Sequence, residues 1–256
     1  MKLFFESLTV SFSMYSRIPM PQIKWNGKNM RYSLLFLPVV GAVVATVLYG
    51  VFFLFRYFSL SPVFFASAAV LVPVLLTGGI HVDGYCDTCD ALASHSDRET
   101  RLSIMKDPHI GAFGLIYTCT LLLLQFGAWH QIFLKPGFIL PALASFVLSR
   151  ALAALAIIDF PKAKQSGLAA TFSGFSSKRP ATAVLVIVVA LLALFMTVGC
   201  NWAGLAIPAA ALLFFWAFYG MSKRQFEGVT GDLAGFFITI CETLALVVSA
   251  VLGAVL

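Results

Sequence analysis

Long apolar stretches alternate with shorter polar breaks along nearly the whole chain. An α-helix needs about 20 mostly apolar residues to cross the hydrocarbon core of a bilayer, and these stretches come close to that length. The pattern therefore predicts an all-α fold, a polytopic helical bundle integral to a membrane. We expect seven transmembrane helices, at residues 33–55, 61–80, 112–134, 138–158, 181–199, 203–220 and 233–256.

The composition agrees with a membrane protein. The 256 residues are 60% hydrophobic and only 11% charged, whereas a soluble globular protein has about 25% charged residues. The start of the chain has Glu6 within its apolar run and no small-residue cleavage site, so we expect no cleavable signal peptide. Residues 3–16 instead suggest an amphipathic helix lying at the membrane interface. Because no repeat or low-complexity segment divides the chain, we expect one membrane-embedded domain over residues 1–256.

The polar breaks fall into two groups that differ in length and charge. Three breaks are tight turns, at residues 56–59, 135–137 and 200–201. The other four are long, at residues 17–32, 81–111, 159–180 and 221–232. Fourteen of the 17 Lys and Arg residues lie in the long breaks or the N-terminal helix, two (Arg56 and Lys135) lie in tight turns, and Arg150 falls inside a span. Cytoplasmic loops carry an excess of Lys and Arg, so we expect the long breaks to face the cytoplasm. The basic residues also suit contact with anionic lipid.

One long break, Thr77–Gly111, holds six of the eleven acidic residues. Three of them, Asp83, Asp87 and Asp90, have i, i+4, i+7 spacing, which places them on one face of a helix. Unpaired carboxylates so arranged repel one another and raise one another's pKa. Mg²⁺ prefers oxygen ligands and usually takes one or two carboxylates plus substrate phosphates. We expect all three to be metal ligands and catalytic residues; the alternative is a solvated acidic face.

The residues around this acidic motif add to the predicted site. Pro73 and the pair Gly78-Gly79 should end the second span, so that a new helix begins near His81. His81 is a candidate general base, phosphate contact or metal neighbour. The CxxC formed by Cys86 and Cys89 has no second Cys or His pair, so zinc or redox chemistry is disfavoured and two small residues on the other side of the helix are expected.

Five further charged residues are candidate substrate contacts. Lys106, next to Asp107, could meet a phosphate as a point charge, although the end of a helix before Pro108 explains it equally well. Arg150 is costly inside a membrane and should face a partner within the protein. A phosphate or one of the Asp residues would serve, and a purely structural ion pair is the alternative.

The last span contributes the other two candidates. Asp232 should lie at its cytoplasmic end, and Glu242, ten residues on, about 15 Å deeper. Glu242 is either functional or a neutral packing residue. Together the residues indicate a membrane enzyme that transfers a phosphoryl group from a diphosphate-activated donor to an alcohol, with a magnesium site facing the cytoplasm. We expect no nucleic-acid partner.

Two motifs resemble the signature of a known family. The segments GGIHVDGYCDTCDAL (residues 78–92) and IMKDPHIGAFG (residues 104–114) are similar to those of the cobalamin synthases, the adenosylcobinamide-GDP ribazoletransferases of vitamin B12 biosynthesis. Shorter matches follow in family order over nearly the whole chain: Arg17-Ile18-Pro19, Ser149-Arg150, Gly167-Leu168 and Thr230-Gly231-Asp232 with Glu242.

The resemblance implies a specific reaction and site. The cobinamide phosphate of adenosylcobinamide-GDP would pass to α-ribazole or its 5′-phosphate with release of GMP, in a magnesium-dependent enzyme of the bacterial cytoplasmic membrane, where the lipid bilayer surrounds it. A homo-oligomer or association with other vitamin B12 enzymes fits the same picture. The residues carried over are His81, Asp83, Asp87, Asp90, Lys106, Asp107, Arg150, Asp232 and Glu242.

The chain departs from the family pattern at a few positions. Ala91 stands where Gly is usual, His109 and Thr239 where an Arg and a carboxylate are common, and Lys162 and Lys164 where an Arg is often seen. These departures concern substrate contacts and leave the three Asp residues intact. Two rival interpretations are disfavoured. The site of a transporter would lie at the midplane between repeated halves, whereas the carboxylates here are expected at the cytoplasmic edge and no repeat is visible. The motif of a CDP-alcohol phosphotransferase has an Ala-Arg pair that is missing here.

Overall fold

The computed structural model describes residues 2–30, 32–163, 178–200 and 202–256. Within these residues the secondary structure consists of helices joined by loops, with one isolated β-bridge between Lys162 and Val229. The predicted all-α polytopic bundle is confirmed. The long helices are α3 (Leu37–Tyr57), α4 (Pro62–Thr77), α7 (Ala112–Leu134), α8 (Ile139–Asp159), α10 (Lys178–Gly199), α11 (Ala206–Phe226) and α12 (Gly231–Val255).

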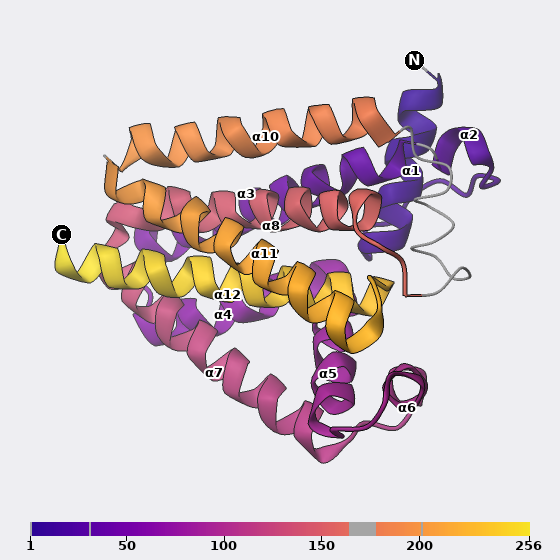
Figure 1. Cartoon of the computed structure of the whole chain (residues 1–256). Helices are drawn as coiled ribbons and strands as arrows, with labels where there is room; N and C mark the ends of the chain where they lie inside the picture. Colours follow the sequence, from indigo (N-terminus) through magenta and orange to yellow (C-terminus); the bar gives the residue numbers. More distant parts are fainter. Residues whose placement is uncertain (1, 31, 164–177, 201) are drawn as a thin grey trace.

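Six helices in the described ranges are long and apolar enough to cross a membrane, and the span predicted at residues 61–80 corresponds to the first helix of a bent pair, Pro62–Thr77 and Ile80–Ala93. α4 is followed at once by α5 (Ile80–Ala93), and the two axes differ by 94°. Gly78 and Gly79, with φ of 70° and 80°, make this bend in a backbone conformation that favours glycine. The acidic helix α5 therefore leaves the line of α4 and runs across the long helices (Figure 1).

α8 lies at the centre of the bundle and is buried along most of its length. α3, α10 and α12 surround it, as Figure 1 shows, with α7 diverging towards α5 and α6 (Arg98–Ile104). Small residues fill much of α8, including a run from Ala151 to Ala156 interrupted by Leu152 and Leu155. Small side chains let membrane helices approach closely, where packing rather than hydrophobic burial drives association. α8 thus packs closely against the helices around it.

The N-terminal segment forms the predicted helix, α1 (Lys2–Tyr15), which lies at one end of the long helices (Figure 1). Its exposed side carries Phe4 and Phe5, while Ser7 and Ser11 are buried against the protein. An apolar outer face suits an interfacial position, which stays a prediction. The short helix α2 (Gly27–Met30) follows before the chain enters α3.

Several residues used in the sequence analysis lie outside the described ranges. They are Arg31, Lys164, the Gly167-Leu168 match and Asn201. The tight turn before α4 has the expected length, since α3 ends at Tyr57 and α4 begins at Pro62. α5 and α6 both lie in the long break that was expected to hold the acidic motif.

Candidate active site

The acidic helix α5 packs against the start of α12 at a point where no side chain intervenes. A β-carbon added to Gly84 would lie only 2.6 Å from the carbonyl oxygen of Asp232. Thr230 caps α12 by accepting a hydrogen bond from the backbone N–H of Leu233 at 3.2 Å, so Asp232 lies in the first turn of that helix. The close approach adds Asp232 to the carboxylates of α5, although 142 positions separate it from Asp90 in the sequence.

Asp87 lies at the centre of this group. Its carboxyl is partly buried, and burial, together with the negative charges of Asp83, Asp232 and Asp90, raises its pKa to about 6. Asp83 is exposed, and Asp87 and Asp232 are partly exposed. The predicted repulsion between the α5 carboxylates is therefore present, with a fourth negative charge added. A bound cation would relieve this repulsion.

Asp90 has an additional role that its position in the motif did not indicate. Its two carboxylate oxygens accept hydrogen bonds from the backbone N–H groups of Gly111 and Gly114, both at 2.8 Å. These N–H groups belong to the first turn of α7, where a helix lacks internal partners and favours negative charge. Asp90 therefore links α5 to the N-terminus of α7. Each oxygen keeps a further lone pair, and metal ligation by Asp90 stays a prediction.

The carboxylates do not form a ready-made metal cage. In the described part of the chain, no three His, Cys, Asp or Glu side chains converge as ligands of one ion. Magnesium, however, is usually held by one or two carboxylates plus waters and substrate phosphates. Asp83, Asp87 and Asp232 are oxygen donors of the right kind and could hold an ion that arrives with a phosphate.

A cavity of about 120 Å³, which we call the Asp232 cavity, opens beside this cluster. Its polar lining includes His81, Asp83 and Asp232, and most of the remaining wall is apolar. The ring of Tyr15, from α1, stacks on His81 with centroids 6.5 Å apart and planes 24° apart. The Asp232 cavity is therefore lined both by acidic side chains of the cluster and by apolar side chains.

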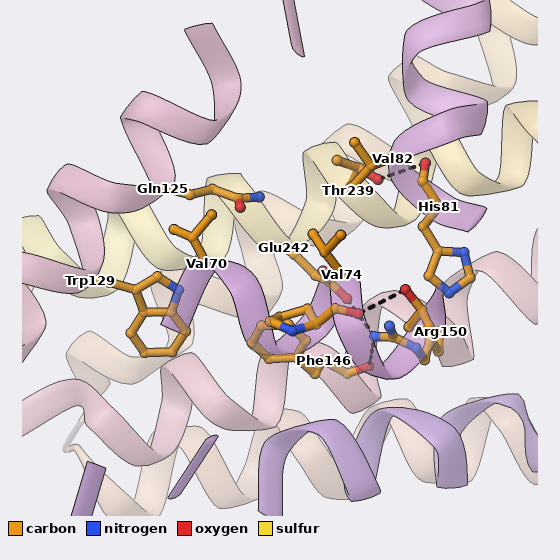
Figure 2. Close-up of a pocket in the computed structure, with 12 residues that line it drawn as sticks. Val70, Val74, His81, Val82, Gln125, Trp129, Phe146, Arg150, Thr239 and Glu242 are labelled. Atoms are coloured by element: carbon orange, nitrogen blue, oxygen red, sulfur yellow. Dashed lines mark hydrogen bonds and ion pairs between the residues drawn. The ribbon is translucent and has the colours of Figure 1, made fainter. Parts of the chain in front are cut away.

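A second, smaller cavity lies deeper in the bundle, and we call it the Arg150 cavity (Figure 2). Arg150, fully buried on α8, forms an ion pair with Glu242 of α12, which is 7% exposed. Ser149 donates to the same carboxylate at 3.1 Å, and Arg150 also donates to the carbonyl oxygen of Phe146 at 2.9 Å. The cavity measures about 20 Å³, enough for one water molecule. Of the alternatives considered for Arg150, the structure shows the structural ion pair, and its partner is Glu242.

His81 lines both cavities and so lies between the two sets of charges. Figure 2 shows its ring on the same side of the Arg150 cavity as Arg150 and Glu242, away from Trp129. Burial and the positive charge of Arg150 hold the pKa of His81 well below its ordinary value, so the ring is neutral at neutral pH. Its Nε2 atom is buried without a hydrogen-bond partner. Thr239 donates to the carbonyl oxygen of His81 at 3.0 Å and so ties α5 to α12.

A sequence profile of the cobalamin-5-phosphate synthase family matches residues 7–250. The chain belongs to this family. The adenosylcobinamide-GDP ribazoletransferase of Lachnoclostridium phytofermentans is 39% identical, over 93% of this chain and 91% of the relative. A protein of the same name from Geobacillus kaustophilus is 34% identical, over 92% of this chain and 91% of the relative. Another, from Clostridium perfringens strain 13, is 30% identical, over 94% of this chain and 96% of the relative. No solved structure matches the chain.

Family membership confirms the resemblance drawn from the two motifs, and it identifies the chain as an enzyme of the cobalamin-5-phosphate synthase family. Not every residue carried over from that family lies at the cluster. Lys106 lines a shallow, open depression together with Arg98, Glu99, Leu102 and Ser103. Asp107 accepts hydrogen bonds from the backbone and ring of His109, at 2.9 and 2.7 Å, which lower its pKa. Neither Lys106 nor Asp107 lines the two cavities.

The contacts of Arg98 were not predicted from the sequence. Arg98 donates to the carbonyl oxygens of Ala163, at 2.7 Å, and Phe226, at 3.2 Å, and pairs with Glu227 at 3.2 Å. These bonds fix α6 to the ends of α8 and α11, beside the start of α12. All five cysteines are free, and Cys86 and Cys89 are buried. The prediction that both lie on the other side of the acidic helix is wrong for Cys86, because its Sγ atom and the carboxylate of Asp90 both lie next to Gly114.

Proposed function

We propose that this protein transfers the cobinamide phosphate of adenosylcobinamide-GDP to α-ribazole or α-ribazole 5′-phosphate, forming adenosylcobalamin or its 5′-phosphate and releasing GMP. Family membership and the names of the relatives support this reaction. The observation that carries the proposal is the meeting of Asp83, Asp87 and Asp232 beside a cavity at one end of a membrane bundle. A diphosphate donor needs compensation of its charge at the bond that breaks, and carboxylates next to phosphate require a cation between them.

The chain's residues would divide the work as follows. Asp83, Asp87 and Asp232 would hold Mg²⁺, which would supply positive charge for the departing phosphate oxygen. An acceptor hydroxyl oxygen attacks the phosphorus nearest cobinamide, the bond from that phosphorus to the oxygen of GMP breaks, and GMP leaves. His81 or Asp83 takes the hydroxyl proton, because both line the cavity beside the cluster and neutral His81 has an unpartnered Nε2.

The Arg150–Glu242 ion pair would stabilise the packing of the helices next to this site. Because Arg150 is fully buried and already paired, the geometry favours a supporting role over the direct phosphate contact expected from the sequence. The pair joins α8 to α12 next to His81. Lys106, exposed but outside both cavities, stays a predicted phosphate contact.

We further propose that the protein lies in the bacterial cytoplasmic membrane with the acidic cluster facing the cytoplasm. The distribution of Lys and Arg supports this orientation, and nucleotide substrates occur on that side. A cysteine introduced at exposed Thr100, after the exposed Cys119 and the partly exposed Cys200 have been changed to Ser, should react with an impermeant reagent only in opened cells. Labelling in intact cells would contradict the orientation. Self-association and contact with other vitamin B12 enzymes stay predictions.

The reaction is tested with the full-length protein purified in detergent. Supplied with adenosylcobinamide-GDP, α-ribazole and Mg²⁺, it should release GMP and form a cobalamin in equal amounts. Omission of Mg²⁺ should stop both. A folded sample that produces neither, at any Mg²⁺ concentration, would refute the proposed function. A transporter or a CDP-alcohol phosphotransferase gains no support from the relatives.

A further inference from the structure

We propose that the Asp232 cavity holds the flat apolar base of the acceptor nucleoside, in an orientation that places its ribose beside the acidic cluster. This inference rests on the proposed function and names the part of the substrate that this cavity binds. Five helices contribute to the cavity: α1, α3, α5, α8 and α12. The apolar side chains that line it are those of Met14, Leu37, Ile80, Ile157, Ala234 and Ile238.

The size of the cavity selects among the three large groups of the two substrates. An engineered apolar cavity of about 150 Å³ binds benzene, and the Asp232 cavity measures about 120 Å³. The enclosed space is therefore about that of a single flat ring, so a base of two fused rings would enter it only in part. A corrinoid macrocycle is far too large, which leaves the guanine of the donor and the dimethylbenzimidazole of the acceptor.

The chemistry of the wall separates these two bases. Guanine carries an amide, an amino group and ring nitrogens, and buried groups of this kind need hydrogen-bond partners. Leu37, Ile157 and Ile238 offer none from their side chains. A dimethylbenzimidazole has two methyl groups and only one free ring nitrogen, so its buried edge asks for little beyond apolar contact. The apolar end of the cavity therefore matches the acceptor base.

The polar end of the cavity matches the rest of the acceptor. His81 is 7% exposed, and its Nε2 atom has no partner, so a polar group of a ligand would satisfy it. The stacked ring of Tyr15 provides a flat neighbouring surface. A nucleoside with its base against Ile238 would bring its ribose towards His81 and Asp83. The attacking hydroxyl would then lie next to the groups proposed to accept its proton.

The test fills the cavity and follows each substrate separately. Ala234 is 4% exposed and lines the cavity, so Ala234→Leu places a larger side chain in it. Because one methylene in an apolar pocket changes specificity by tenfold or more, KM for α-ribazole should rise by about tenfold or more. KM for adenosylcobinamide-GDP should stay within about twofold of wild type. The matched control is Ala245→Leu, on the same helix, 2% exposed and outside both cavities.

The possible results separate the two proposals. If wild-type protein shows no transfer, the proposed function fails. If it shows transfer but Ala234→Leu leaves KM for α-ribazole unchanged, or raises KM for the donor instead, only the cavity assignment fails. An equal rise of the ribazole KM in Ala245→Leu would also overturn it, because overpacking of α12 would then be the cause.

A second variant keeps the proposal testable if Ala234→Leu does not fold. Ile238→Ala removes part of the wall and enlarges the cavity. It should raise kcat/KM for a riboside with a larger base, such as naphthimidazole, relative to α-ribazole. An unchanged ratio between the two acceptors, in a variant that still turns over, would contradict the assignment.

Discussion

Asp83, Asp87 and Asp232 carry like charges at the partly exposed end of the bundle, whereas Arg150 and Glu242 carry opposite charges inside it. The first group repels itself, and the pKa of Asp87 rises as a result. The second group is compensated by its own ion pair and by Ser149 and the Phe146 carbonyl. Crowding of like charge, as between Asp83 and Asp87, costs stability and favours a cationic ligand, whereas compensated buried charge contributes to structure. Stability and activity should therefore respond oppositely to substitutions in the two regions.

The largest effect is expected when the buried pair is broken. Glu242→Ala leaves the guanidinium of Arg150 buried without its counter-charge, which should cost about 3–5 kcal/mol of folding free energy. Unfolding in a mild detergent, titrated with a denaturing one, measures the loss. The control is Arg150→Met combined with Glu242→Leu, which should regain most of the stability because no charge is left unpaired. A single Glu242→Ala variant as stable as wild type would show that the pair contributes nothing.

The opposite outcome is expected at the acidic cluster. Asp87→Asn removes a proposed cation ligand and also a repulsive charge, so activity should fall by about 100-fold or more while stability stays the same or rises. GMP release and the unfolding midpoint, measured on one preparation, test both parts. Asp97→Asn, on an exposed carboxylate outside the cluster, is the control for a changed charge on this side. Retention of activity at ordinary Mg²⁺ would refute the ligand role of Asp87.

Asp90 combines features of the acidic cluster and of the buried, compensated pair. Its charge belongs to the acidic face, yet both of its oxygens bond to the start of α7. Asp90→Asn should lower the free energy of unfolding by about 1 kcal/mol, the usual value of a helix cap, a loss that Asp87→Asn should not show. If Asp90→Asn abolishes activity with unchanged stability, then its bonds to α7 contribute little and its main role is at the cluster.

The smallest predicted effect is the pH dependence of cation binding. Asp87 has a raised pKa of about 6, and a proton on this carboxyl competes with the cation. The charged form is present above that pKa and is lost as pH falls through it, so Mg²⁺ affinity should drop about fourfold between pH 7 and pH 5.5. Titration of Mg²⁺ against GMP release at each pH gives the apparent affinity. The same drop in Asp87→Asn would assign the dependence to another group.

The sequence was sufficient for the spans and for the acidic helix, because both depend on local signals. Apolar runs located the long helices to within a few residues, and Gly78-Gly79 indicated where α5 would begin. Those signals act over one or two helical turns. Asp97, another acidic residue of this break, lies outside the cluster and caps α6 by accepting a hydrogen bond from the backbone N–H of Thr100 at 2.9 Å.

The pairings between helices could not be predicted in the same way. Arg150 had several candidate partners, and only the register of α8 against α12 selects Glu242. The bond from Asp90 to α7 and that from Arg98 to Ala163 join positions 21 and 65 residues apart. No periodicity in the chain encodes such contacts, because they depend on how finished helices pack. Asp232 was placed correctly at the start of the last helix, but its approach to α5 depends on Gly84.

Gly84 has a consequence for how this protein can change in evolution. A position that contributes no functional group determines how closely two acidic segments approach, because any β-carbon there would press on the backbone of Asp232. Even Gly84→Ala would move α5 from α12 and alter the spacing of the carboxylates without changing one of them. Selection on the affinity of the cluster for its cation would therefore act on this glycine as strongly as on the acidic residues themselves. A survey that sought functional positions only among reactive side chains would overlook it.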